Sequence, residues 1–105
     1  MPDDEAGSVM MAAYIIVDVE ITDPVRYAAY ISVVPPTIAK YGGRFLVRGG
    51  KAETLEGSWK PKRVVVVEFP TFEKAREWWA SEEYRGPRAL RQSASVTDMI
   101  LVEGV

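Results

Sequence analysis

The sequence predicts an α+β domain in which four β-strands form one antiparallel sheet and helices cover one face of it. Two β-branched segments, residues 14–20 and 63–69, have the composition and alternation of strands. An apolar stripe at spacings of three and four runs from Tyr27 to Tyr41 and is typical of an amphipathic helix. The chain has 105 residues, which is the size of one domain.

The first strand, residues 14–20, leads into a helix. Asp23 can cap this helix, and Pro24 fits its first turn because that position makes no use of an amide hydrogen. The apolar stripe continues across Pro35-Pro36, which lack that hydrogen inside the helix. We therefore expect the helix to break or kink there while Ile38 stays buried.

A short strand over residues 44–48 follows, with a glycine pair at each end. Because side chains alternate along a strand, Arg44, Leu46 and Arg48 are predicted to share one face of the sheet. The polar, turn-rich residues 51–62 are expected to form a loop around Trp59.

Residues 63–69 contain four consecutive valines, which predicts the central strand of the sheet. The next helix carries adjacent tryptophans, Trp78 and Trp79, of which only one can face the core. Gly86-Pro87 is expected to interrupt the helical segment that follows. A last strand over residues 97–103 completes a β-α-β-β-α-β order, the ferredoxin-like arrangement.

Composition excludes several partners. The chain has 13 Lys and Arg against 15 Asp and Glu, so it lacks the basic field that binds nucleic acid. It has no apolar run of the roughly 20 residues needed to span a membrane. Residues 1–11 are acidic and small, and are expected to be a disordered tail before a single domain over residues 12–105. We expect a cytoplasmic protein.

The chain contains no Cys and no His. It therefore lacks the thiolate nucleophile, the commonest general base and the commonest metal ligands. We expect neither a metal site nor a cofactor.

Several motifs carry a family resemblance. They are residues 41–50 (Tyr-Gly-Gly-Arg-Phe-Leu-Val-Arg-Gly-Gly), Glu56-Gly57 with Trp59, Glu68-Phe69-Pro70, residues 81–84 (Ser-Glu-Glu-Tyr), Arg91 and Val102-Glu103-Gly104. Together with the order of elements, they make residues 12–104 resemble domain-of-unknown-function family 1330. The resemblance implies a dimeric α+β barrel, a superfamily that includes cofactor-free monooxygenases, lactone isomerases and haem enzymes beside members of no known activity.

The face of the sheet away from the helices is the predicted functional surface. Arg44 and Arg48 would bind a carboxylate or enolate oxygen, because guanidinium suits planar bidentate contacts. Glu68 or Asp18 would act as the catalytic base on the same face. The remaining predicted ligand-binding residues are Trp59 and Tyr84, at the mouth of the pocket, and Arg91.

Each of these residues also has a structural interpretation. The charges on the open face of the sheet would form salt bridges that fix a homodimer. Trp59 would anchor its loop on the second helix, and Tyr84 and Arg91 would share a hydrogen bond that ties the last helix to the sheet.

Two functions therefore remain open. One is a homodimeric protein that binds a small organic acid or carbonyl compound, with or without a cofactor-free enzyme activity. The alternative is a non-catalytic dimeric module whose charged sheet face only specifies assembly.

Overall fold

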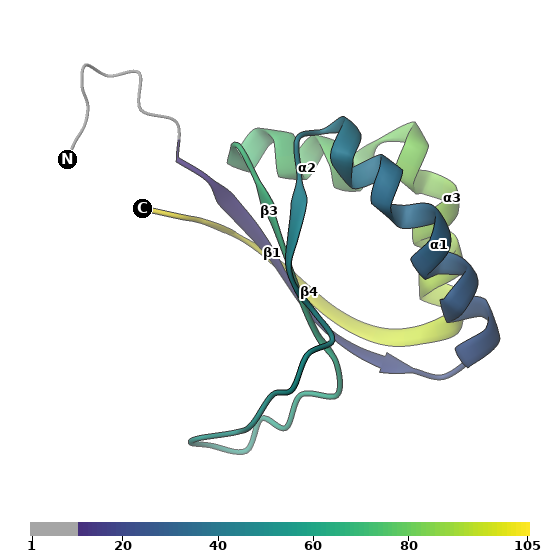
Figure 1. Ribbon diagram of the computed structural model, residues 1–105, viewed down its shortest axis with the longest axis vertical. Helices are drawn as coiled ribbons and strands as arrows, with labels where there is room; N and C mark the ends of the chain where they lie inside the picture. The colour runs from purple at the N-terminus through teal and green to yellow at the C-terminus, as the bar shows by residue number, and fades with distance from the viewer. Residues whose placement is uncertain (1–10) are drawn as a thin grey trace.

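The computed structural model describes residues 11–105 and shows one four-stranded antiparallel sheet with helices on one face (Figure 1). The expected tail over residues 1–11 lies, except for Met11, outside the described residues. The elements in chain order are β1 (Ala13–Ile21), α1 (Pro24–Lys40), β2 (Arg44–Arg48), β3 (Val64–Phe69), α2 (Phe72–Ala80), α3 (Glu82–Ala94) and β4 (Ser95–Glu103).

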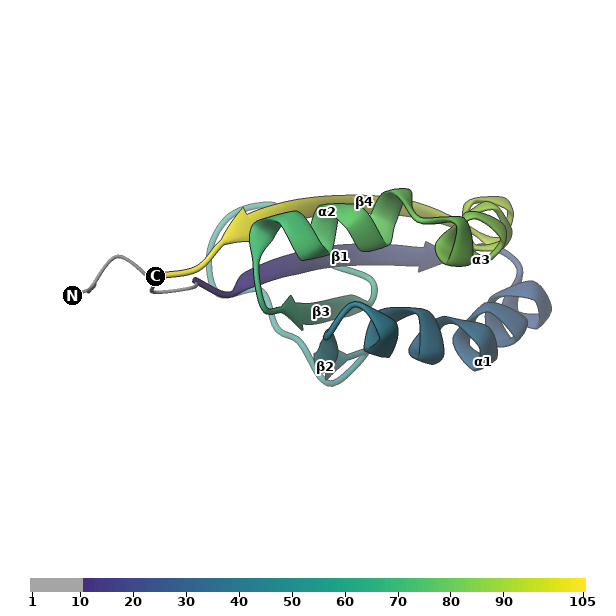
Figure 2. The same cartoon turned by 90° about the horizontal axis from the view of Figure 1, so that it is seen from above.

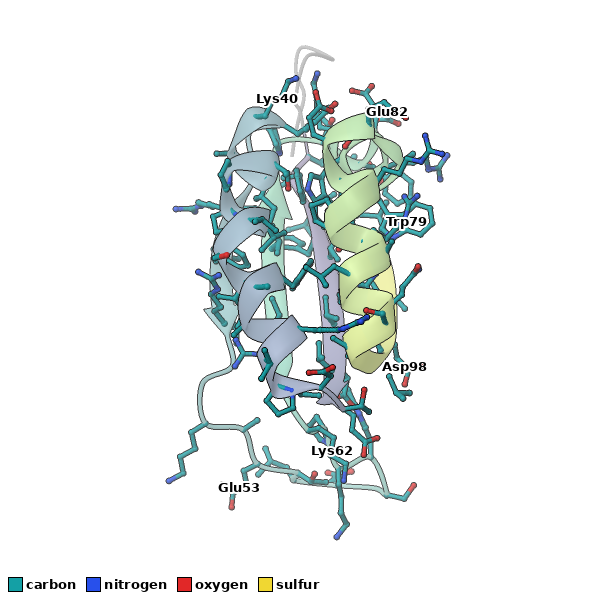
Figure 3. All side chains as sticks on the ribbon, turned by 90° about the vertical axis from the view of Figure 1, so that its right-hand side faces the viewer. Lys40, Glu53, Lys62, Trp79, Glu82 and Asp98 are labelled. Atoms are coloured by element: carbon teal, nitrogen blue, oxygen red, sulfur yellow. The ribbon has the colours of Figure 1, made fainter. Side chains whose placement is uncertain are left out.

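The strands lie in the order β2-β3-β1-β4, so the valine-rich β3 is central as predicted. Viewed from above, α1 lies on the β2–β3 side and α2 lies on the β4 side (Figure 2). The connection between β2 and β3 carries Glu53 and Lys62 and extends beyond the end of the sheet (Figure 3). The α+β fold class is confirmed. No helix within residues 11–105 has the length and apolar character needed to cross a membrane.

The core lies between the helices and the sheet, and its pattern follows the alternation of the strands. Along β1 and β3 every second residue is buried, and the residues between them are half-buried on the open face. The helices contribute aromatic rings, with Trp78 stacked 4.0 Å from Tyr84 and 5.5 Å from Phe69 between ring centroids. Trp78 is 2% exposed and Trp79 is 42% exposed, so one tryptophan faces the core and the other lies at its edge, as predicted.

The prediction of a break at Pro35-Pro36 is wrong, because α1 stays helical from Pro24 to Lys40. Pro35 cannot donate to the carbonyl of Ile31 four residues earlier, so that carbonyl lacks its helical partner. The Arg48 guanidinium donates to it instead, with an Nη2–O distance of 3.1 Å. Ile38 is buried, as expected.

The expectation that Arg44 and Arg48 share a face is also wrong. Arg44 pairs with Glu68 across β2 and β3, but the register shifts between Phe45 and Val47, and Arg48 pairs with Val65. A β-bulge of this kind inserts one extra residue and reverses the alternation that follows it. Arg48 therefore lies on the face covered by the helices, where its guanidinium stacks 4.2 Å from the centroid of the Phe45 ring.

The last helix is also longer than the sequence predicted. Gly86-Pro87 does not interrupt it, and α3 runs without a break from Glu82 to Ala94. Ser81 caps this helix, since its hydroxyl accepts from the backbone amide of Tyr84 at 3.2 Å. A proline deprives a helix of one hydrogen bond, which the packing of the buried Tyr84, Arg91 and Ala94 outweighs.

The contact of Arg48 with α1 gives a test of its structural role. We expect Arg48→Met to lower the free energy of unfolding by about 1 kcal/mol, because the Ile31 carbonyl loses its donor. In a Pro35→Ala background the amide introduced at position 35 supplies that donor, so Arg48→Met should lower the free energy of unfolding by less. Denaturant unfolding of the four proteins in this double-mutant cycle measures the difference. Equal costs in both backgrounds would contradict the assignment.

Candidate functional site

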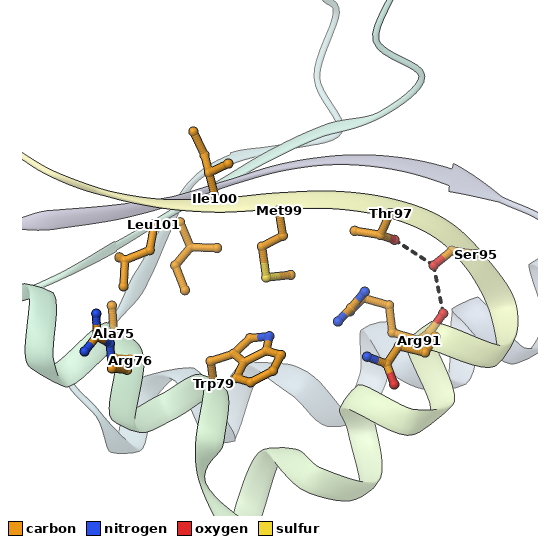
Figure 4. Close-up of a pocket in the computed structure, with 11 residues that line it drawn as sticks. Ala75, Arg76, Trp79, Arg91, Ser95, Thr97, Met99, Ile100 and Leu101 are labelled. Carbon is orange, nitrogen blue, oxygen red and sulfur yellow. Dashed lines mark hydrogen bonds between the residues drawn. The ribbon is translucent and has the colours of Figure 1, made fainter.

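A cavity of about 550 Å³ lies between β4 and the helices α2 and α3 (Figure 4). Its walls are mainly apolar side chains, including one methionine, and its polar groups come from the helices and from the start of β4. The residues that line it include Trp79, Arg91, Ser95, Thr97, Met99 and Leu101. A concave, mostly apolar space with a few polar groups is the usual form of a small-molecule site.

Arg91 is the central polar residue of this cavity. It lies in the last turn of α3 and is only 5% exposed. Its Nε donates to the hydroxyl of Tyr84 at 3.2 Å, and that hydroxyl lies 2.8 Å from the hydroxyl of Tyr30 on α1. This network holds the side chain so that its guanidinium points into the cavity (Figure 4). The hydrogen bond predicted between Tyr84 and Arg91 is therefore present, but both residues belong to α3, so it links this helix to α1 and not to the sheet as predicted.

No carboxylate within residues 11–105 forms a salt bridge with Arg91. The side chains lining the cavity include a second arginine, Arg76, and no Asp or Glu. The cavity is therefore a cationic environment that lacks a protein counter-ion in the described part of the chain. An organic anion is the ligand that such an environment favours.

The apolar walls of the cavity are a tryptophan, a thioether and aliphatic side chains. Trp79 presents its indole to the cavity from α2, opposite Met99 and Leu101 on β4 (Figure 4). Arg88 does not line the cavity, but its guanidinium lies 4.5 Å from the centroid of the Trp79 ring. A cation held over an indole face restrains the ring, so this wall has a defined position.

The residues predicted on the open face of the sheet form a separate group. Arg44 Nε lies 2.7 Å from Glu68 Oε1, and the hydroxyl of Tyr14 donates to the same carboxylate at 3.3 Å. The Arg44 guanidinium and the Tyr14 hydroxyl hold the pKa of Glu68 below its usual value. Arg44 therefore has a carboxylate partner, unlike Arg91. The catalytic role of Glu68 stays a prediction.

Asp18 holds the long β2–β3 connection against the open face of the sheet. Its carboxylate accepts from the Trp59 indole at 2.9 Å and from the backbone amide of Lys62 at 2.8 Å. These two hydrogen bonds, indole first, lower the pKa of Asp18. Trp59 is 61% exposed and packs here, on a hollow of about 140 Å³, and not on α2. The base role of Asp18 stays a prediction.

Sequence reasoning found Arg91 but assigned it to the wrong surroundings. Tyr84 is fully buried behind Arg91, Trp59 lies on the opposite face of the sheet, and neither lines the mouth of the cavity. Ser95 was missed because β4 begins two residues earlier than predicted, and Thr97 lay in the predicted strand without being considered as a site residue. Their alternation with Met99 was the available signal, since residues 95, 97 and 99 face the same side of a strand.

The fold and the cavity define a class: a ferredoxin-like α+β protein with an arginine-containing cavity between its sheet and its helices. The family described as "Domain of unknown function (DUF1330)" matches residues 12–105, and the chain belongs to it. No curated protein matches the chain.

Solved structures share the fold. A protein of unknown function from Rhodopseudomonas palustris, RPA0582, is 20% identical with a TM-score of 0.74, and the match covers 95% of this chain and 87% of that one. SnoaB, a cofactor-independent oxygenase from Streptomyces nogalater, is 12% identical with a TM-score of 0.55, and the match covers 89% of this chain and 91% of that one. At these identities the likeness shows the fold alone.

The pKa of Asp18 predicts how acid releases Trp59. The carboxylate's hydrogen bonds stabilise the docked connection above the unfolded-state pKa of 3.8, and this stabilisation is lost as pH falls through the lower folded-state pKa. We expect the fluorescence of Trp59, taken as wild type minus Trp59→Phe, to shift towards that of solvated indole below about pH 4. Asp18→Asn should remove the transition. An identical titration in Asp18→Asn would contradict the assignment.

Proposed function

We propose that this protein binds a small organic acid with an apolar body in the cavity beside β4, and that Arg91 holds the acid group. The observation that carries the proposal is the buried Arg91 guanidinium, which faces the cavity without a carboxylate partner from residues 11–105. The apolar walls formed by Trp79, Met99 and Leu101 would contact the rest of the ligand.

The energetics of burial support this assignment. A charge removed from water loses several kcal/mol of solvation unless an opposite charge compensates it. Arg91 has one side-chain hydrogen bond among the described residues, from Nε to Tyr84. Its two terminal nitrogens remain for a carboxylate, which a guanidinium binds bidentately. A ligand anion would supply the compensation that the chain itself does not.

Binding is better supported than a reaction. The two carboxylates predicted as bases, Asp18 and Glu68, lie on the opposite face of the sheet from Arg91. The hydroxyls hydrogen-bonded to the Arg91 guanidinium, directly or through one link, are those of Tyr84 and Tyr30, and burial raises the pKa of Tyr30, so its hydroxyl stays protonated and cannot act as a base near neutral pH. The fold shared with a cofactor-independent oxygenase is compatible with a cofactor-free activity but does not itself argue for one.

The open face of the sheet favours assembly as a second role. It carries half-buried apolar side chains of β1 and β3 and exposed ones of β2 and β4, and its one arginine on β2, Arg44, is paired with Glu68. An apolar sheet face of this kind is rarely left in water by a stable monomer. We therefore infer a homodimer in which two such faces meet. The apolar residues of this face include Ile16, Val47, Val64, Val66, Ile100 and Val102.

The proposed binding predicts that the charge of Arg91 contributes to ligand affinity and not to the stability of the ligand-free protein. Arg91→Met should leave the free energy of unfolding of the ligand-free protein unchanged or raised, because it replaces an uncompensated buried cation with an apolar chain of similar length. The same substitution should weaken phenylacetate binding at least thirtyfold, since a buried charge pair is lost. Denaturant unfolding and calorimetric titration measure the two effects.

Arg44→Met is the matched control, because Arg44 lies on the opposite face and outside the cavity. Its phenylacetate affinity should equal that of the wild type. If Arg91→Met instead lowers the free energy of unfolding by about 3 to 5 kcal/mol, Arg91 is a structural charge. Unchanged affinity in Arg91→Met would overturn the proposed function.

The inferred dimer predicts a solution mass. Light scattering at micromolar concentration should give twice the chain mass of 11.7 kDa. Val66→Asp, which places a charge on the open sheet face, should give the single-chain mass. Val33→Asp changes an exposed valine on α1 and should keep the dimer. A monomeric wild type would exclude this assembly.

A further inference from the structure

We propose that the cavity selects acids that carry a hydroxyl group next to the acid group. This inference rests on the proposed function, because it assumes that Arg91 binds the acid. The observation behind it is that the hydroxyl groups at the start of β4 have a limited number of protons to donate to a ligand. Ser95 and Thr97 both line the cavity, and each side chain has one proton to donate.

The hydroxyl proton of Ser95 is already engaged in a hydrogen bond within the chain. Its Oγ lies 2.7 Å from the backbone carbonyl oxygen of Arg91. A carbonyl oxygen only accepts, so two oxygens at this distance require Ser95 to donate.

The hydroxyl proton of Thr97 is then also engaged in a hydrogen bond, because Ser95 has no second proton to donate. Thr97 Oγ1 lies 2.8 Å from Ser95 Oγ, and in such a pair either hydroxyl could be the donor. Because Ser95 gives its proton to Arg91, Thr97 must donate in this second bond. Neither hydroxyl then has a proton for a ligand, and both present only lone pairs to the cavity.

These acceptors lie beside the group that would hold the acid. Ser95 binds the backbone of Arg91 itself, and the Arg91 side chain, Thr97 and Met99 face the same space (Figure 4). A carboxylate on the guanidinium would therefore bring a neighbouring substituent of the ligand towards Thr97. A hydroxyl there can donate to Thr97 Oγ1, whereas a methoxy or keto oxygen would meet a lone pair.

The other polar side chains of the cavity do not change this result. Arg76 is a donor only, and it favours the acid group and not the hydroxyl. Gln92 can both donate and accept, but its side chain belongs to an exposed residue at the edge of the cavity. Gln92→Leu therefore serves as a control.

Three probes that differ in one substituent test the proposal. They are 2-hydroxy-2-phenylacetate, as separate enantiomers, phenylacetate and 2-methoxy-2-phenylacetate. We expect one enantiomer of the hydroxy acid to bind the wild type about three- to tenfold more tightly than phenylacetate, the range of one hydrogen bond between neutral groups. The methoxy acid should bind no more tightly than phenylacetate. Calorimetric titration provides the dissociation constants.

Two substitutions separate the hydroxyl preference from general binding. Thr97→Val is similar in shape and should remove the preference while the affinity for phenylacetate is kept. Ser95→Ala frees the Thr97 proton, so the ratio between the affinities of the methoxy and hydroxy acids should approach one. Gln92→Leu should keep the wild-type ratio.

The outcomes distinguish this inference from the proposed function. If all three acids bind the wild type equally and Arg91→Met weakens all of them, the hydroxyl preference is wrong and the acid site stands. A preference that survives in Thr97→Val also overturns the inference. If none of the acids binds, the acid site is wrong and the inference is overturned with it.

Discussion

The contact between Arg91 and Tyr84 is the interaction on which the site depends. Tyr84 is fixed by its stacking on Trp78 and by the hydroxyl of Tyr30, so α1, α2 and α3 all contribute to holding one guanidinium. Because these aromatic rings fill the core, the arginine cannot turn towards the helices. It extends into the space between α3 and β4, and the chain keeps a buried cation next to a cavity.

The two faces of the sheet are chemically different, and a single extra residue contributes to this difference. The bulge at Leu46 leaves Arg44 on the open face and moves Arg48 under α1. Arg44 then neutralises Glu68, and Arg48 supplies the donor that Pro35 removes from the Ile31 carbonyl. Both arginines therefore have protein partners that satisfy them, whereas Arg91 in the cavity has no carboxylate partner among residues 11–105.

Much of the fold could be predicted, because alternation and apolar stripes report directly on burial. The four strands, the central position of β3 and the separate environments of Trp78 and Trp79 follow from such local patterns. The continuity of α1 through Pro35-Pro36 could not, since it depends on packing and on a donor from β2 that is distant in sequence.

The site was less predictable than the fold, because it depends on contacts between residues that are distant in sequence. A bulge has no clear sequence signal in residues 44–48, yet it decides which face Arg48 occupies. The cavity depends on how α2 and α3 sit over β4, which no periodicity specifies. Arg91 was identified through its motif, but its lack of a counter-ion is a property of three-dimensional packing.

A crystal structure of the protein with phenylacetate would test the central claim most directly. The account predicts the carboxylate on the terminal nitrogens of Arg91 and the phenyl ring between Trp79 and Met99. Phenylacetate bound on the open sheet face beside Arg44, or an Arg91 guanidinium already paired with a carboxylate of a second subunit, would contradict it.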